Sequence, residues 1–389
     1  MTGALIPLNS TMLAVALRTI ADDLHVGRGR AAVLVTAYLV AMLVCQPVAG
    51  RIGDRFGTRR VLAVATVGFG IASVGAAFSP TFAVLLVGRC AQALFGAALS
   101  PNTQALLRAT VAPGRRGRTF GIVGTGVGVG AALGPVLGGF LADSVGWRGI
   151  FAVNLPLAAL ALALLARTSA KRGVAEAVAD ERPRRLSLEL LGSRSFRASC
   201  ITQATSNYAL YTVLLVLPLL LADKGWAGAG VGLATSGLTV GMLVLGPLGG
   251  LLGDRRRRTV PILLGLAVLF VGCVILALGT ARTALVVGGP LVMGVGMGLS
   301  GASLQAAALE SVRQEVSGSA AGLFSASRYV GSITASVAIS ATDVSGIADA
   351  HPVLVATVVA TALAVVAGRR IDPRVGTIDP GTTSATIES

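Results

Sequence analysis

The residues of this sequence with the clearest chemical potential are charges placed beside or inside long apolar runs. Asp54 follows one such run and stands among arginines. An acid in that setting offers charge-assisted hydrogen bonds that can hold one conformation of a protein. Arg89 and Arg328 lie within apolar runs, where an arginine normally faces a partner or a water-filled cavity. The pattern therefore indicates that Asp54 helps to hold one conformation and that the two arginines face a partner or a ligand-binding cavity.

Carboxylates are the groups that would carry protons through such a protein. An acid in the middle of an apolar run can bind a proton and a cationic compound alternately, because either one neutralises the buried charge. All 17 acids fall in loops, tails or at the ends of apolar runs. Asp22 and Asp23, which end the first run, are therefore our candidates for proton coupling.

The sequence lacks the combinations of residues that catalysis inside a membrane would need. Intramembrane hydrolysis needs a Ser/His pair, a metal cluster or paired aspartates inside the apolar runs, and the sequence shows none of these. Its two histidines, His25 and His351, lie at the ends of runs. We expect no catalytic residue, no metal and no cofactor.

The composition is that of an integral membrane protein. Hydrophobic residues make up 54% of the 389 residues, charged residues 13%, and the mean hydropathy is +0.80, whereas soluble domains carry about 25% charged residues. Continuous runs near 20 residues predict spanning helices, because barrel strands would be about half as long and alternate in polarity. The twelve expected spans are 3–21, 31–50, 61–79, 82–107, 119–142, 148–166, 197–222, 228–251, 259–280, 283–309, 318–342 and 351–368.

The net charge of +15 predicts an orientation. With the N-terminus inside, 24 of the 32 Lys and Arg residues lie in inner loops and the tail, six lie near outer ends, and two are Arg89 and Arg328. The positive-inside rule then places both termini in the cytoplasm of a cell-membrane protein. We expect these basic loops to contact anionic lipid headgroups, and we expect no nucleic acid.

The polar stretches divide the chain into four parts. Residues 1–166 form an N-terminal half of six helices, and 167–196 form a basic cytoplasmic linker. Residues 197–368 form a second half of six helices, and 369–389 a polar tail predicted to be disordered.

The two halves repeat each other at an offset of 200 residues. Nine of sixteen positions between 40 and 55 are identical to their partners, where chance would give about two. The scarcer matches are Met42/Met242, Pro47/Pro247, Asp54/Asp254 and Arg55/Arg255. Parallel repeats of this kind place a pseudo-twofold axis along the membrane normal and a cavity between the halves.

The segment after the second run resembles the GxLaDrxGrk signature of the major facilitator superfamily. Gly50, Asp54, Arg55, Gly57 and Arg59 carry the match, Thr58 replaces the usual basic residue, and Gly253, Asp254 and Arg255 repeat it. The glycines are expected to form a tight cytoplasmic turn and the charges to gate the halves. The resemblance implies an all-α membrane fold of twelve helices in two pseudo-symmetric halves.

Two further motifs support that resemblance. Arg89, Gln92 and Gly96 in the fourth run look like RxxQGxGaa, which implies that Arg89 assists proton coupling; the alternative is an arginine satisfied by carbonyls or by Gln92. The fifth run looks like the GxxxGPxxGG motif of antiporters, which in the family is associated with exporters. The alternative is a face for helix packing. Its residues are Gly130, Gly134, Pro135, Gly138 and Gly139.

Several polar residues are expected to face the cavity between the halves. Each of them could bind substrate or join helices, and Arg328 could complement an anionic substrate or pair with a neighbouring carbonyl. In the seventh run, three of them share one face at a spacing of four residues. The set is Asn9, Gln92, Asn102, Gln203, Asn207, Tyr211, Gln305 and Arg328.

The leading functional hypothesis is a monomeric exporter of small hydrophobic compounds, drugs or secondary metabolites, in exchange for protons. One alternative is transport of an anionic metabolite through Arg89 and Arg328, which the absence of a mid-span acid favours. Another is a membrane scaffold that does not transport. The first-run segment from Leu8 to Leu17 resembles the drug:proton antiporter branch, with Asn9 at the position of its acid.

Overall fold

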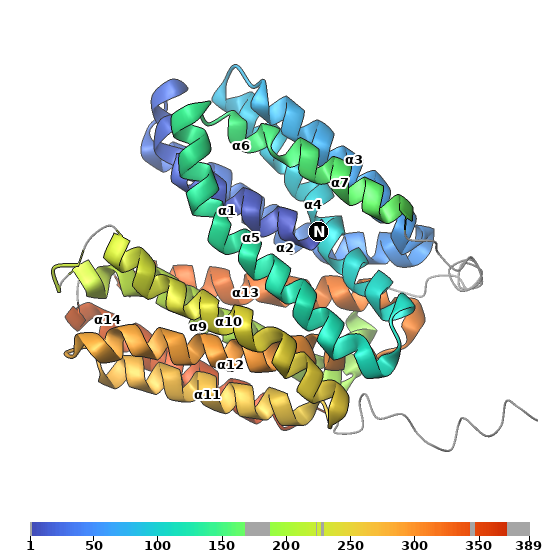
Figure 1. The fold of residues 1–389 in the computed structure, drawn as a ribbon, viewed down its shortest axis with the longest axis vertical. Helices are drawn as coiled ribbons and strands as arrows, with labels where there is room; N and C mark the ends of the chain where they lie inside the picture. The colour runs from blue at the N-terminus through green and yellow to red at the C-terminus, as the bar shows by residue number, and fades with distance from the viewer. Residues whose placement is uncertain (1, 168–186, 223, 227–228, 343–346, 372–389) are drawn as a thin grey trace, which may run out of the picture.

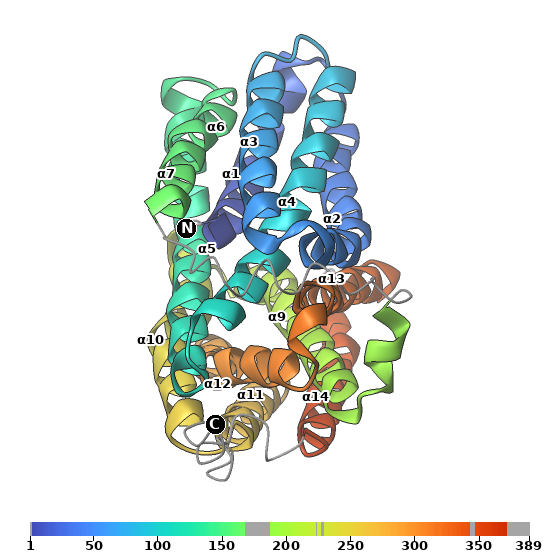
Figure 2. The ribbon, with the colours of Figure 1, turned by 90° about the vertical axis from the view of Figure 1, so that its right-hand side faces the viewer.

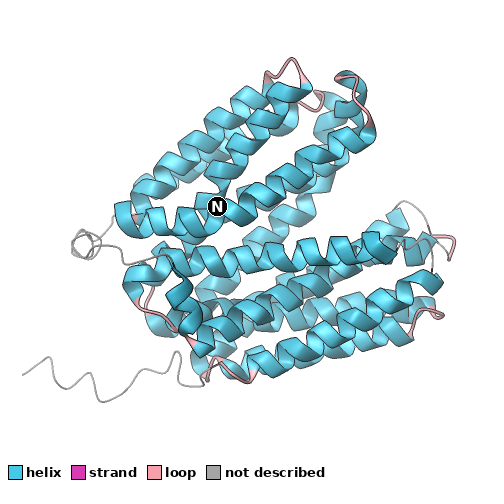
Figure 3. Ribbon diagram, turned by 180° about the vertical axis from the view of Figure 1, so that it is seen from behind, coloured by secondary structure: helices cyan, strands magenta, loops and turns pink. Residues whose placement is uncertain are grey.

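The computed structural model describes residues 2–167, 187–222, 224–226, 229–342 and 347–371. Within these ranges the secondary structure is helical and contains no strand (Figure 3). The long helices are α1 (Thr2–Asp23), α2 (Arg28–Phe56), α3 (Thr58–Ala77), α4 (Phe82–Thr110), α5 (Arg116–Ser144), α7 (Asn154–Arg167), α9 (Arg194–Ala222), α10 (Ala229–Arg255), α11 (Thr259–Leu278), α12 (Thr283–Glu310), α13 (Ser317–Thr342) and α14 (Ile347–Gly368). Short helical turns are η1 (Pro113–Arg115), α6 (Gly149–Ala152), η2 (Ser187–Gly192) and η3 (Gln314–Val316).

Every predicted span coincides with helix. In the described residues, nine helical segments are long and apolar enough to cross a membrane. The three remaining spans correspond to α1, α5 and α13, helices of 22, 29 and 26 residues. Large aliphatic side chains are exposed along the outer faces, among them Val44, Val64, Ile71, Val87, Ile122, Val244, Leu264 and Val359. The fold is that of a multi-pass membrane protein.

The sixth predicted span is broken near its start. α6 ends at Ala152, and α7 begins at Asn154. Pro156 explains the break, because it has no N–H to donate to the Ala152 carbonyl and its ring crowds that carbonyl. The break positions Asn154, whose side chain is fully buried.

The predicted turn over the signature segment is wrong for most of its length. Residues 50–56 continue α2, and only Gly57 separates α2 from α3. The apolar run ends before the helix does, because a helix satisfies its own backbone whether its side chains are apolar or charged. Within the signature segment, only Gly57 has a positive φ, +88°, which favours glycine. Gly50 and Gly53 are helical and have another role.

The helices form two groups, α1–α7 and α9–α14, each of which packs within itself. Between the groups, α5 packs on α10 and α2 on α13 (Figure 2), and α4 also contacts α13 while α5 also contacts α12. The groups converge at the end of the molecule where α2, α4, α10 and α12 finish, and they diverge toward the opposite end (Figures 1 and 3). We call the converging end the basic end, since Arg55, Arg59 and Arg255 lie there.

The predicted linker and tail lie largely outside the described residues. Of the linker, 187–196 is described and contains η2 and the start of α9. Of the tail, only 369–371 is described. The apolar interior has one large cluster in the second group, reaching Phe120 of α5, and two in the first group, around Met12 and around Met42.

Candidate functional site

The first contact between the groups at the basic end joins Asp54 to the start of α13. Asp54 Oδ1 accepts a hydrogen bond from the Gly318 N–H at 2.6 Å, and Oδ2 accepts one from the Ser319 N–H at 2.7 Å. The Ser319 hydroxyl also donates to Oδ2, at 2.6 Å. The first N–H groups of a helix lack partners within the helix and carry partial positive charge, so they bind a carboxylate well.

The second contact repeats the first at the start of α5. Asp254 Oδ1 accepts a hydrogen bond from the Gly117 N–H at 2.9 Å, and Oδ2 accepts one from the Arg118 N–H at 2.7 Å. Asp54 and Asp254 are the acids paired by the 200-residue offset. Each therefore caps a helix of the opposite group. The two copies of the repeated acid thus make the same type of contact.

Glycines allow these helices to approach. A Cβ atom on Gly50 would lie 1.9 Å from the carbonyl oxygen of Gly318, and one on Gly250 would lie 2.0 Å from that of Gly117. Both neighbours are backbone atoms, which cannot rotate away. Gly53 and Gly253 serve contacts within each group, since their Cβ atoms would meet Asn102 of α4 and Ser303 of α12.

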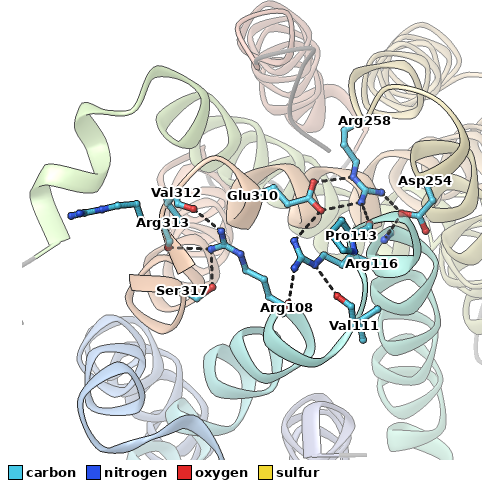
Figure 4. A network of polar contacts seen from close by, with 11 residues as sticks. Arg108, Val111, Pro113, Arg116, Asp254, Arg258, Glu310, Val312, Arg313 and Ser317 are labelled. Atoms are coloured by element: carbon cyan, nitrogen blue, oxygen red, sulfur yellow. Dashed lines mark hydrogen bonds and ion pairs between the residues drawn. The ribbon is translucent and has the colours of Figure 1, made fainter. Parts of the chain in front are cut away.

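A buried ion network reinforces the second contact (Figure 4). Arg258 donates to Asp254 and, at 3.0–3.1 Å, to both carboxylate oxygens of Glu310; it also donates to the Pro113 carbonyl of the other group at 3.1 Å. Its side chain is 1% exposed, and that of Glu310 is 7% exposed. Arg116 lies 3.8 Å from the same carboxylate.

Arg258 lies between α10 and α11, and the carboxylates of Asp254 and Glu310 stabilise its positive charge. Burial alone lowers the pKa of its guanidinium. The hydrogen bond and charge of Glu310, followed by those of Asp254, outweigh burial and raise that pKa above its ordinary value. The network therefore keeps a full positive charge in a dry position.

A further arginine, Arg108 at the end of α4, joins the groups through carbonyls. It donates to the Val312 carbonyl at 2.6 Å, to the Arg313 carbonyl at 3.3 Å and to the Ser317 hydroxyl at 2.8 Å. These acceptors form the link between α12 and α13 (Figure 4). Arg108 thus adds a polar connection between the groups next to the Asp54 contact, since Ser317 precedes the Gly318 that binds Asp54.

The two contacts are not chemically equal. Thr58, which replaces a basic residue in the signature, is paired by the offset with Arg258. The charge missing from the first copy is therefore present in the second, where it binds two acids. Sequence reasoning missed Arg258, Glu310 and Arg108. The offset could have indicated Arg258, while the other two lie far along the chain from the residues they contact.

The remaining signature arginines lie outside both contacts. Arg55 stacks over the ring of Phe56 at 5.3 Å. Arg59 donates to the Leu165 carbonyl at 3.0 Å, at the end of α7. Arg255 is exposed. A groove of about 850 Å³ at the basic end is lined by Arg55, Arg59 and the end of α7.

Arg89 belongs to a chain of polar side chains buried inside the first group. Arg89 donates to Gln92 at 2.8 Å, and Gln92 donates to Ser73 at 2.7 Å. Asn154 donates to Ser73 and to Asn9, at 3.3 and 3.0 Å. The Arg89 guanidinium also lies over the ring of Tyr38, 4.2 Å from its centroid. The chain crosses α1, α3, α4 and α7.

The other predicted cavity residues divide by burial. Asn9, Gln92 and Asn102 are fully buried, and Asn102 donates to the Ala49 and Ala98 carbonyls, so in this conformation all three join helices. Asn207 is 3% exposed and donates to the Gln203 carbonyl within α9. The side chains of Gln203, Tyr211, Gln305 and Arg328 are partly exposed.

The predicted antiporter motif packs α5 against α1. A Cβ atom on Gly138 would lie 2.7 Å from the Cα atom of Met12. Gly130 and Gly134 are buried, and α5 continues through residue 135 without a break. Contacts of the Pro135 side chain lie outside the described atoms.

The proton-coupling candidates on α1 differ in their surroundings. Asp23 Oδ2 accepts a hydrogen bond from Trp147 Nε1 at 3.0 Å and forms an ion pair with Arg148 at 2.8 Å. The bond from Trp147, followed by that from Arg148, lowers the pKa of Asp23 below its ordinary value. Asp23 is therefore ionised at neutral pH. Its neighbour Asp22 is exposed.

Comparison with known proteins gives one family. The family model of the Major Facilitator Superfamily matches residues 1–336. The uncharacterized MFS-type transporter YvkA of Bacillus subtilis is 31% identical over 388 residues, which cover 86% of this chain and 87% of that protein.

Two further relatives are named for resistance. The multidrug resistance protein B homolog of Mycobacterium tuberculosis is 29% identical over 79% of this chain and 71% of that protein. The tetracenomycin C resistance and export protein of Streptomyces glaucescens is 38% identical over 43% of this chain and 31% of that protein. Among solved structures, a double tryptophan mutant of XylE superposes with a TM-score of 0.79 at 16% identity, covering 95% of this chain and 92% of that one.

Proposed function

The chain belongs to the Major Facilitator Superfamily, and we propose that it is a secondary active transporter which exports small, largely hydrophobic compounds across the cell membrane. Relatives named for multidrug resistance and for tetracenomycin C export support this substrate class. The groups of helices act as the two halves of the transporter, with the binding cavity between them. The proposed halves are 1–166 and 197–368.

The observation that carries the proposal is the pair of carboxylate contacts at the basic end. Asp54 and Asp254 each bind the start of a helix in the opposite half, while the halves diverge at the other end (Figure 1). Contacts of this kind hold one conformation of a transporter that rocks about a central site. Breaking them opens the basic end and lets the diverging end close.

The charge distribution orients this conformation. The 24 basic residues of the inner loops and tail favour a cytoplasmic basic end and cytoplasmic termini. The cavity in this conformation then opens outward, as an exporter requires when it releases its substrate. Substrate enters after the two carboxylate contacts have separated.

Proton antiport is the finer part of the proposal. A proton carrier must gain and lose its proton near neutral pH. The lowered pKa of Asp23 keeps it ionised there, which argues against Asp23 as the carrier and leaves Asp22 as the other proposed candidate on α1. Arg89 would modulate coupling through the buried chain that it forms with Gln92, Ser73 and Asn154.

Efflux from everted vesicles with an acidic interior tests the proposal. We expect the native protein to accumulate hydrophobic dyes, and Asp54→Asn and Arg89→Ala to reduce the initial rate by about tenfold or more, equivalent to about 1.4 kcal/mol. The matched control is Asp143→Asn, an exposed acid at the end of α5. Failure of the native protein to move any neutral or charged dye would contradict export and favour a scaffold.

A further inference from the structure

Three of the four tyrosines gather with Arg328 where the halves meet. Tyr38 belongs to α2, Tyr211 to α9, and Arg328 and Tyr329 to α13, which packs against both α2 and α9 (Figure 2). The Tyr329 hydroxyl lies close enough to Tyr38, Tyr211 and Arg328 for electrostatic interaction. Its ring packs against the apolar cluster that contains Tyr38. We call these four residues the tyrosine–arginine cluster.

Arg328 lies near the middle of α13, with its side chain partly exposed. It is the twelfth residue of the 26-residue helix α13, and a rise of about 1.5 Å per residue places it about 17 Å from the start of that helix. Its backbone carbonyl accepts a bond from Ser332. In the described part of the chain its guanidinium makes no hydrogen bond and no ion pair. An arginine at this depth is costly unless it meets a partner or water.

The second arginine of the region is already engaged. Arg89 donates to Gln92 and stacks on Tyr38. It therefore adds positive charge behind the Tyr38 ring without offering Arg328 a partner. No acid among the described residues lies in the middle of a long helix, so Arg328 of the cluster and the neighbouring Arg89 have no balancing carboxylate there.

Gln46 of α2 contributes a second unpartnered group. Its side chain is 2% exposed and interacts with the Tyr329 hydroxyl, while its Oε1 atom has no hydrogen-bond partner. A buried acceptor without a donor is costly. A ligand with a hydroxyl or N–H group could supply that donor.

From these groups we infer that the cluster binds an aromatic compound carrying one negative charge, a carboxylate or a phenolate. Arg328 compensates the charge, the partly exposed rings of Tyr211 and Tyr329 stack on the aromatic part, and Gln46 Oε1 accepts a hydrogen bond when the compound has a donor. This inference rests on the proposed function and names the substrate class for the same cavity.

An anionic substrate also accounts for the absence of a mid-span acid. A membrane potential that is negative inside drives an anion outward, by about 50-fold in concentration for each 100 mV. That driving force acts on the charge of the substrate and requires no carboxylate at the cluster. Exchange for an incoming proton would add to it.

Binding to the purified full-length protein in nanodiscs tests the inference. The probes are 2-naphthoate, its uncharged amide 2-naphthamide, and the cation 2-naphthylmethylammonium, which share one ring system. We expect naphthoate to bind at least about tenfold tighter than naphthamide, and the cation to bind most weakly. Arg328→Gln should reduce the naphthoate preference to about onefold, and Arg328→Lys should restore part of it.

Arg282→Gln, which removes an exposed arginine at the start of α12, is the matched control and should retain the preference. A thermal melt and gel filtration establish that each variant is folded. The inference is overturned if the native protein binds naphthamide as well as naphthoate, or if Arg328→Gln keeps the preference. Dye efflux in vesicles separates the two proposals: export of neutral dyes without preference for anions overturns only this inference, whereas absence of all export overturns the proposed function.

Discussion

Gly50→Ala is expected to prevent closure of the basic end and to reduce transport by about 5- to 150-fold. The new Cβ atom would lie 1.9 Å from the Gly318 carbonyl oxygen, a backbone atom that only a shift of α2 or α13 can relieve. Overpacking of this kind costs about 1–3 kcal/mol, and the conformation with separated halves avoids the clash. The whole cost therefore falls on one side of the conformational equilibrium.

The control for this variant is Gly75→Ala in α3. Nothing lies within 4 Å of the Cβ position at Gly75, so alanine there should leave transport unchanged. Gly250→Ala, the partner of Gly50 by the offset, should behave as Gly50→Ala does, because its Cβ would lie 2.0 Å from the Gly117 carbonyl. Native initial rates of dye efflux in both Gly50→Ala and Gly250→Ala would contradict the role of these contacts.

Arg258→Gln is expected to destabilise the protein more than any other single change to the network. It leaves the Asp254 and Glu310 carboxylates, 2% and 7% exposed, without their main partner. Removing one member of a buried ion pair costs about 3–5 kcal/mol, because the remaining charge is uncompensated. The measurement is the melting temperature of the purified protein in detergent, together with its efflux rate.

Two comparisons isolate this effect. Arg256→Gln removes an exposed neighbouring arginine and should melt like the native protein. The double variant Arg258→Met/Glu310→Met removes the central pair together and should regain much of the lost stability, because the buried charge of Glu310 is gone. If Arg258→Gln melts at the native temperature, the network does not stabilise this conformation.

The sequence was sufficient to predict the helices because each apolar run has the length of a membrane span. The repeated signature also identified Asp54, Asp254 and the neighbouring glycines as candidate gate residues. It did not predict that residues 50–56 remain helical, because the helix continues after its apolar side chains end. Gly50 and Gly53, which lie in that segment, allow neighbouring helices to approach closely. The spacing of residues along one helix does not reveal such a contact.

The partners of the proposed gate residues could not be predicted from the sequence. Asp54 binds a helix that begins 263 residues later along the chain, and Arg108 binds carbonyls more than 200 residues away. Such contacts depend on how the two groups of helices pack against each other. Arg258 was also missed, although the offset pairs it with Thr58 and could have marked it as a charge that the first copy lacks.

Alternating access between the halves is tested most directly by two distances measured on the same protein. Spin labels at exposed positions report them by pulsed electron resonance: Arg115 with Gln314 at the basic end, and Val145 with Arg282 at the opposite end. The four native cysteines are replaced beforehand. With a dye exported in the vesicle assay, we expect the first distance to increase and the second to decrease. Distances that both stay unchanged, or that both increase, would contradict transport by rocking of the two halves.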